Sequence, residues 1–132
     1  MSSMTASASA SSARLEDRAG EPLVSVLTAT FNSSPYLEET LESALGQGYT
    51  NLEVIVADDC SPDDTLEVAR AVGRSHPGRV VLEPGTEREG PCRRRNAALA
   101  RARGSLICWL DGDDLWLPGK IERQVEVMER EP

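Results

Sequence analysis

The chain has 132 residues, of which 39% are hydrophobic and 4% aromatic, and its formal net charge is −8 at pH 7. These values predict one domain with an aliphatic core. They exclude a sequence-independent nucleic-acid binder, which needs a basic surface, so no nucleic-acid partner is expected. The three cysteines include no close pair, which argues against a disulfide framework and against a zinc site.

The first 20 residues are rich in Ser and Ala and contain no apolar stretch. This composition predicts a disordered tail over residues 1–20, followed by a folded domain over residues 21–132. No basic region precedes a hydrophobic one, so a signal peptide is not expected. No segment approaches the length needed to cross a bilayer. The expected location is therefore cytoplasmic, either free or peripheral to the inner face of the membrane.

Strand and helix signals alternate from Glu21 onward. Short runs of β-branched and aliphatic residues predict strands at 23–30, 52–57, 79–83 and 105–110. Capped helix starts are expected at Ser34-Pro35 and Ser61-Pro62, a third helix at 91–103, and a fourth from about Pro118. The alternation predicts an α/β fold, with a mainly parallel sheet and helices on both faces.

Polar residues follow three of the predicted strands, at residues 28–32, at Asp58 and Asp59, and at residues 111–114. In sheets of this kind, ligands bind outside the carboxyl ends of the strands. Asp111 and Asp113 point to the same side of an extended segment. Two such carboxylates can hold a divalent metal and leave positions open for phosphate oxygens. The alternative interpretation is an acidic surface turn, since Asp and Gly are ordinary turn residues.

Two phosphate-binding signatures are absent. No G-x-G-x-x-G follows the first strand, and no G-x-x-x-x-G-K-[ST] occurs, which excludes the dinucleotide fingerprint and the P-loop. A nucleotidyltransferase is disfavoured because residues 28–32 contain no glycine. Any phosphate holder in this chain must therefore be something else, and a metal on the acidic residues fits.

Several stretches resemble, in the same order, the donor-binding half of a family 2 glycosyltransferase with the GT-A, Rossmann-like fold. The resemblance covers residues 23–123 and rests on VSVLTATFN at 24–32, LESAL at 41–45 with Gln47, EVIVADD at 53–59, Gly90 with Arg95 and Asn96, ARG at 102–104, and LDGDD at 110–114.

The resemblance assigns roles to residues after the first two strands. It implies that Thr28, Phe31 and Asn32 line the nucleotide pocket. One aspartate of the pair Asp58-Asp59 would contact the base or the ribose, and the second of the two is favoured.

The resemblance also assigns roles near the third and fourth helices. Arg95 would contact the nucleotide, whereas Arg93 and Arg94 are expected on a solvated basic face. Asp111 and Asp113 would form the DxD motif. Asp113 would hold Mn²⁺ or Mg²⁺, and Asp111 would lie near the ribose or the metal.

The implied activity is transfer of a sugar from a nucleotide-diphosphate donor, with a UDP-sugar favoured, to the hydroxyl of an unknown acceptor. The family's general base lies downstream of the DxD motif, so no catalytic residue is assigned here. The chain is thus expected to be a partial, truncated GT-A domain. The alternatives are an inactive nucleotide-sugar-binding module and a structural remnant. Self-association through an exposed sheet edge is also expected.

Overall fold

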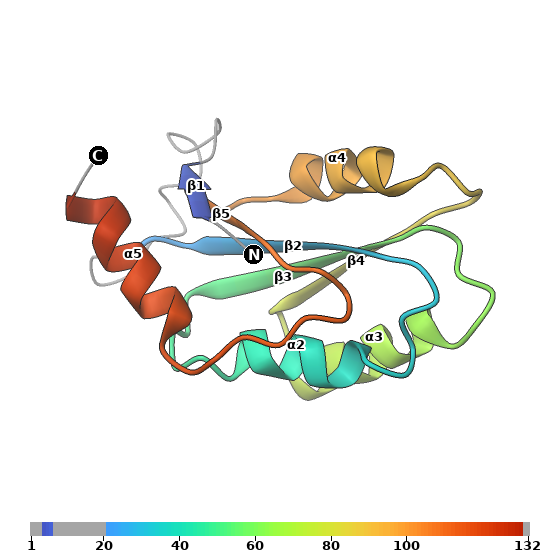
Figure 1. Cartoon of the computed structure of the whole chain (residues 1–132), viewed down its shortest axis with the longest axis horizontal. Helices are drawn as coiled ribbons and strands as arrows, with labels where there is room; N and C mark the ends of the chain where they lie inside the picture. The colour runs from blue at the N-terminus through green and yellow to red at the C-terminus, as the bar shows by residue number, and fades with distance from the viewer. Residues whose placement is uncertain (1–3, 7–20, 131–132) are drawn as a thin grey trace.

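The computed structural model describes residues 4–6 and 21–130. Strands and helices alternate along the chain after a first short strand (Figure 1). In chain order, the elements are β1 (Met4–Ala6), β2 (Val24–Thr30), α2 (Leu37–Leu45), β3 (Leu52–Asp58), α3 (Thr65–Ser75), β4 (Val80–Pro84), α4 (Pro91–Arg101), β5 (Leu106–Trp109) and α5 (Lys120–Arg130).

One sheet in the order β1-β5-β2-β3-β4 forms the centre of the molecule. The neighbours β5, β2, β3 and β4 run parallel, and only β1 is antiparallel to its neighbour. All seven residues of β3 are buried, as expected for a parallel strand covered on both faces. The predicted α/β fold with a mainly parallel sheet is confirmed.

Helices cover both faces of the sheet. In Figure 1, α4 lies on one side of the sheet, and α2 and α3 lie on the other. Ala98 of α4 packs in one apolar cluster with Ile55 of β3. Leu41 of α2 packs in a second cluster that also contains Ile121 and Val125 of α5. No helix among the described residues is both long enough and apolar enough to cross a membrane.

The predicted helix caps at Ser34 and Ser61 are wrong. The two helices begin later, at Leu37 and Thr65. Asp63 instead connects the start of α3 to the loop before α2, because its carboxylate accepts hydrogen bonds from the backbone N–H of Thr65 (3.0 Å) and of Ser34 (3.4 Å). Donation from the Thr65 hydroxyl is the main reason that the pKa of Asp63 is lowered. The Ser61 hydroxyl does not cap α3, because it accepts a hydrogen bond from the Asn32 backbone N–H and donates to the carboxylate of Asp58 instead.

The strand β1 lies within the tail predicted to be disordered. Met4 pairs with Cys108 of β5, and its side chain is buried against the core. The predicted disorder therefore does not extend to Met4–Ala6. The other residues of the tail lie outside the described residues. With β1 beside β5, the edges of the described sheet are β1 and β4. Self-association through an edge stays a prediction.

Candidate functional site

The carboxyl ends of β2, β3 and β5 meet at one edge of the sheet. Thr30 pairs in register with Asp58, the last residue of β3. Leu110, directly after β5, donates its backbone N–H to the carbonyl of Leu27 in β2 (2.9 Å). The three polar segments predicted as a site therefore start from neighbouring strands.

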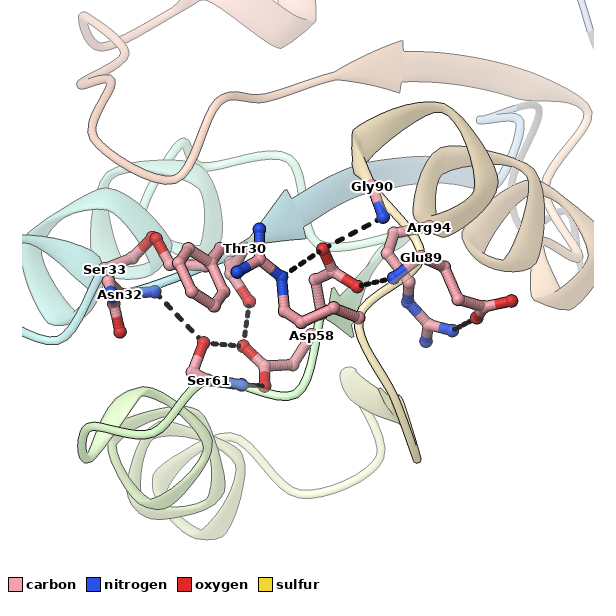
Figure 2. A network of polar contacts seen from close by, with 11 residues as sticks. Thr30, Asn32, Ser33, Asp58, Ser61, Glu89, Gly90 and Arg94 are labelled. Carbon is pink, nitrogen blue, oxygen red and sulfur yellow. Dashed lines mark hydrogen bonds and ion pairs between the residues drawn. The ribbon is translucent and has the colours of Figure 1, made fainter.

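Asp58 connects the first two of these segments (Figure 2). Its Oδ1 accepts hydrogen bonds from the hydroxyls of Thr30 (2.8 Å) and Ser61 (2.7 Å). Its Oδ2 accepts one from the Ser61 backbone N–H (2.8 Å). The side chain is buried. Asp58 is thus used internally, to join the end of β2 to the loop after β3.

Asp59 connects β3 to the loop before α4. Its Oδ1 accepts a hydrogen bond from the backbone N–H of Glu89 (2.7 Å), and its Oδ2 accepts from Gly90 N–H and Arg88 Nε (both 3.1 Å). The Glu89 N–H is the main reason that the pKa of Asp59 lies below its usual value. The guanidinium of Arg88 also lies over the ring of Phe31, 3.5 Å from its centroid. The Arg88 side chain is 58% exposed.

Two residues at this edge have left-handed backbone conformations. Asn32, after β2, has φ 52°, and Cys60, after β3, has φ 57°. Asn tolerates this region because its short polar side chain can bond locally, whereas Cys has no such compensation. The Asn32 backbone N–H donates to the Ser61 hydroxyl (3.0 Å), which ties the two loops together. Local strain of this kind is concentrated at binding and catalytic sites.

Thr28, which was predicted to line the nucleotide pocket, is buried. Its side chain is 0% exposed within β2, and its hydroxyl has no hydrogen-bond partner among the described residues. Its contact with a nucleotide stays a prediction.

The two adjacent arginines of α4 have opposite environments. Arg95 is exposed and makes no hydrogen bond or ion pair with the described residues. Arg94 was expected in solvent but is buried, where it donates to Glu89 Oε1 (3.2 Å) and to the backbone carbonyl of Glu83 (2.6 Å). Arg93 is exposed as predicted. Arg94 thus fixes the position of α4, and Arg95 is available to a ligand.

The acidic loop after β5 presents two unpartnered carboxylates. The side chains of Asp111 and Asp113 are exposed and make no hydrogen bond or ion pair within the described part of the chain. Asp114 differs, since its Oδ1 accepts from the backbone N–H of Leu115 (3.0 Å). The backbone N–H of Asp114 donates to the carbonyl of Asp111 (3.1 Å), which closes a turn.

These two carboxylates do not by themselves make a complete metal site. No group of three His, Cys, Asp or Glu side chains suited to a metal occurs among residues 4–6 and 21–130. Carboxylate oxygens nevertheless suit Mg²⁺ and Mn²⁺. Magnesium commonly takes one or two protein carboxylates together with waters and substrate phosphates. The pair Asp111 and Asp113 fits a metal whose remaining ligands are water and phosphate.

The structure brings together four of the predicted site residues. Phe31 and Asp59 both contact Arg88, and Asn32 and Asp58 both bond to Ser61; the roles of Arg88 and Ser61 were not anticipated. The two groups are joined into one network through Thr30, whose carbonyl accepts from the Asp59 backbone N–H and whose hydroxyl donates to Asp58. No such contact joins Arg95, Asp111 or Asp113 to this network. Arg88 was missed because it lies in a polar loop without periodicity, and Ser61 because it was interpreted as a helix cap.

Another part of the sequence pattern lies at the opposite end of the sheet. Glu53, at the start of β3, is buried and accepts hydrogen bonds from the Ser25 hydroxyl (2.6 Å), the Arg103 backbone N–H (2.9 Å) and Arg103 Nε (3.1 Å). A Cβ added at Gly104 would lie 2.6 Å from Ser25 Oγ, so the close approach requires glycine. The stretch at 102–104 is therefore structural.

Comparison with known proteins identifies the family. Residues 25–132 match the family described as Glycosyl transferase family 2. The chain belongs to this family. A relative within it is the UDP-Glc:alpha-D-GlcNAc-diphosphoundecaprenol beta-1,3-glucosyltransferase WfaP of Escherichia coli, which is 38% identical over 109 residues, 83% of this chain and 42% of that protein. The family 2 chain thus spans about two-fifths of that relative's length.

Solved structures place the family 2 chain in the GT-A fold. The mannosyltransferase PcManGT from Pyrobaculum calidifontis, in complex with GDP-Man and Mn²⁺, is 37% identical, with a TM-score of 0.68 over 72% of this chain and 28% of that one. Residues 1–349 of S. aureus TarS, in complex with UDP-GlcNAc, are 29% identical, with a TM-score of 0.74 over 82% of this chain and 31% of that one. The predicted GT-A, Rossmann-like architecture is confirmed.

Proposed function

We propose that this chain binds a nucleotide-diphosphate sugar through a divalent metal on Asp111 and Asp113, for transfer of the sugar to an acceptor hydroxyl. The observation that carries the proposal is the pair of exposed, unpartnered carboxylates at the carboxyl edge of the sheet. It is supported by the solved neighbour that holds GDP-Man with Mn²⁺. Such a metal, Mn²⁺ or Mg²⁺, would stabilise the charge that develops on the departing diphosphate.

The remaining site residues would hold the nucleotide. Arg95 supplies an unpaired guanidinium on α4, whose amino terminus also favours anions. Phe31 and Asn32 lie at the surface of the same edge, but Arg88 covers the Phe31 ring, so a base that stacks there displaces the guanidinium. Of the two aspartates at the end of β3, Asp59 is the proposed base or ribose contact, because its side-chain partner Arg88 is exposed, whereas Asp58 bonds to Thr30 and Ser61.

The donor and the location are proposed from relatives. A UDP-sugar is favoured, because the E. coli relative is named for UDP-Glc and TarS holds UDP-GlcNAc. The acceptor is not assigned. The chain is proposed to act in the cytoplasm, peripherally at the inner face of the membrane, because the named acceptor of the E. coli relative carries a diphosphoundecaprenol group.

Calorimetric titration of UDP and of GDP, with and without Mn²⁺, tests the proposal. The wild-type chain should bind at least one nucleotide in a Mn²⁺-dependent manner, and Asp113→Asn should lose that dependence. Glu129→Gln is the matched control, since Glu129 is an exposed carboxylate of α5 without a polar partner among the described residues. Metal-independent binding, or equal behaviour of the two variants, would refute the role of Asp113.

A module that binds the donor without transferring its sugar is the second candidate. The roles of the three aspartates on the loop after β5 favour this candidate. Asp111 and Asp113 are assigned to the metal, and Asp114 is half-buried and accepts a hydrogen bond from Leu115, so the loop holds no fully unpartnered acid besides the proposed metal ligands to deprotonate an acceptor. Mn²⁺-dependent binding without release of free sugar or transfer product would identify this second function.

A further inference from the structure

The acidic loop is attached to α2 and to the residues just after it. The Thr40 hydroxyl donates to the backbone carbonyl of Gly112 (3.2 Å), and the Ser43 hydroxyl accepts from the backbone N–H of Trp116 (3.1 Å). Thr40 is fully buried, so the first contact is shielded from water. The two side chains are three positions apart and therefore lie on one side of α2.

Gln47 makes the third attachment and uses both ends of its carboxamide. Its Nε2 donates to the carbonyl of Leu117 (2.8 Å) and to that of Ser43 (3.0 Å), and its Oε1 accepts from the backbone N–H of Ile121 (3.1 Å). Ile121 lies in the first turn of α5, where backbone N–H groups have no partner within the helix. Gln47 is buried and joins the end of α2, the acidic loop and the start of α5.

These attachments leave little freedom to the part of the loop that carries the carboxylates. Asp111 and Asp113 flank Gly112, whose carbonyl is fixed by Thr40. Gly112 is also packed closely, because a Cβ at this position would lie 2.9 Å from Ser33 Oγ. The backbone on which both carboxylates stand is therefore held on two sides. Metal-binding groups need support of this kind to keep a productive geometry.

We propose that Thr40, Ser43 and Gln47 are positioning residues that hold Asp111 and Asp113 ready for the divalent cation of a bound nucleotide. The attachment itself stands on the hydrogen bonds above, and its purpose rests on the proposed function. The competing account is that the three side chains only stabilise the packing of α2 and α5.

Amide hydrogen exchange without ligand tests the attachment. The variants are Thr40→Val, which keeps the side-chain shape, Ser43→Ala and Gln47→Met. Amides of residues 112–121 should exchange about five to ten times faster in them, because each loses one or more hydrogen bonds that hold the loop. Amides of β3 should keep wild-type rates. Ser75→Ala is the control, since within the described part of the chain the Ser75 hydroxyl bonds only to the Ala71 carbonyl of its own helix.

Binding of UDP or GDP, whichever the wild type binds, tests the purpose in the same variants. The Mn²⁺-dependent affinity should fall about tenfold in Thr40→Val and Gln47→Met, while binding without metal stays unchanged. Thr40→Ser, which restores the hydroxyl, should recover the affinity. This rescue separates positioning from a loss of packing.

Each outcome decides one part of the inference. Wild-type exchange of residues 112–121 in all three variants would overturn the attachment. Faster exchange with unchanged Mn²⁺-dependent affinity would leave a purely structural role and overturn the proposal. Lack of Mn²⁺-dependent binding in the wild type would instead overturn the proposed function, and the purpose of the attachment with it.

Discussion

Replacement of Asp59 by Asn separates a structural role of this residue from direct contact with a nucleotide. Asp59 accepts three hydrogen bonds, two of them from backbone N–H groups at the entrance to α4. Because α4 carries Arg95, loss of these bonds would also displace the arginine proposed to bind the nucleotide. We therefore expect Asp59→Asn to lower both the stability of the fold and the affinity for the donor.

The hydrogen bonds that Asp59→Asn removes determine how far the free energy of unfolding falls. An Asn side chain has one acceptor oxygen, so its NH₂ must face either Glu89 N–H or the pair formed by Gly90 N–H and Arg88 Nε. A hydrogen bond to a charged group contributes about 1.5–3 kcal/mol. The Arg88 share is discounted because its side chain is 58% exposed and screened by solvent. The expected loss in free energy of unfolding is about 2–3 kcal/mol.

Urea unfolding measures this loss. With a slope of roughly 2 kcal/mol per molar, the urea midpoint should fall by about 1–1.5 M. Asp64→Asn is the control, because Asp64 is exposed and its side chain makes no capping hydrogen bond. A midpoint within about 0.3 M of wild type would refute the structural role. Weaker donor binding at unchanged stability would show direct contact with the ligand instead.

Three further predictions concern pH, backbone strain and thiols. The pKa values of Asp59 and Asp63 are lowered in the fold, so the ionised carboxylates stabilise the fold above about pH 4. This stabilisation is lost as the pH falls through the pKa values of the folded protein, and a urea midpoint that stays constant down to about pH 3 would contradict the prediction. Cys60→Gly should keep or raise the urea midpoint and Cys60→Val should lower it by the equivalent of about 1 kcal/mol or more, because glycine adopts φ 57° without strain and a β-branched residue does not. Burial raises the pKa of Cys108 to about 11, so a thiol reagent should modify Cys60 and Cys92 first in a mass-spectrometric time course, and equal rates for all three would disprove the burial of Cys108.

The alternation of strand and helix signals was sufficient to predict the parallel part of the fold, although the predicted caps were wrong. The strand expected at 52–57 is observed as Leu52–Asp58, and the one expected at 105–110 as Leu106–Trp109. Such runs are readable because a strand buried on both faces is continuously apolar. The strand Met4–Ala6 was missed because three residues carry no readable period and their partner β5 lies about a hundred residues away in sequence.

The site was only partly readable for a different reason. The sequence pattern placed Asp111 and Asp113 correctly at the end of a strand, since their position follows from the fold. Whether a polar side chain faces solvent or makes hydrogen bonds inside the protein depends on contacts with residues distant in sequence, as the neighbours Arg94 and Arg95 show. Sequence spacing treats these two arginines alike, whereas the hydrogen bonds of Arg94 to Glu83 and Glu89 decide between them.

The cluster around Glu53 has a consequence for how this domain can change. Ser25 belongs to that cluster and Thr30 lies at the carboxyl end of β2, and the two residues are five positions apart in an extended strand, which separates them by roughly 17 Å. Substitutions separated by more than about 10 Å usually contribute independently to stability. Laboratory evolution of the proposed donor preference can therefore randomise the loops after β2, β3 and β5. The cluster around Glu53 at the opposite end of the sheet stays unaltered in such libraries and keeps its contribution to the stability of the fold.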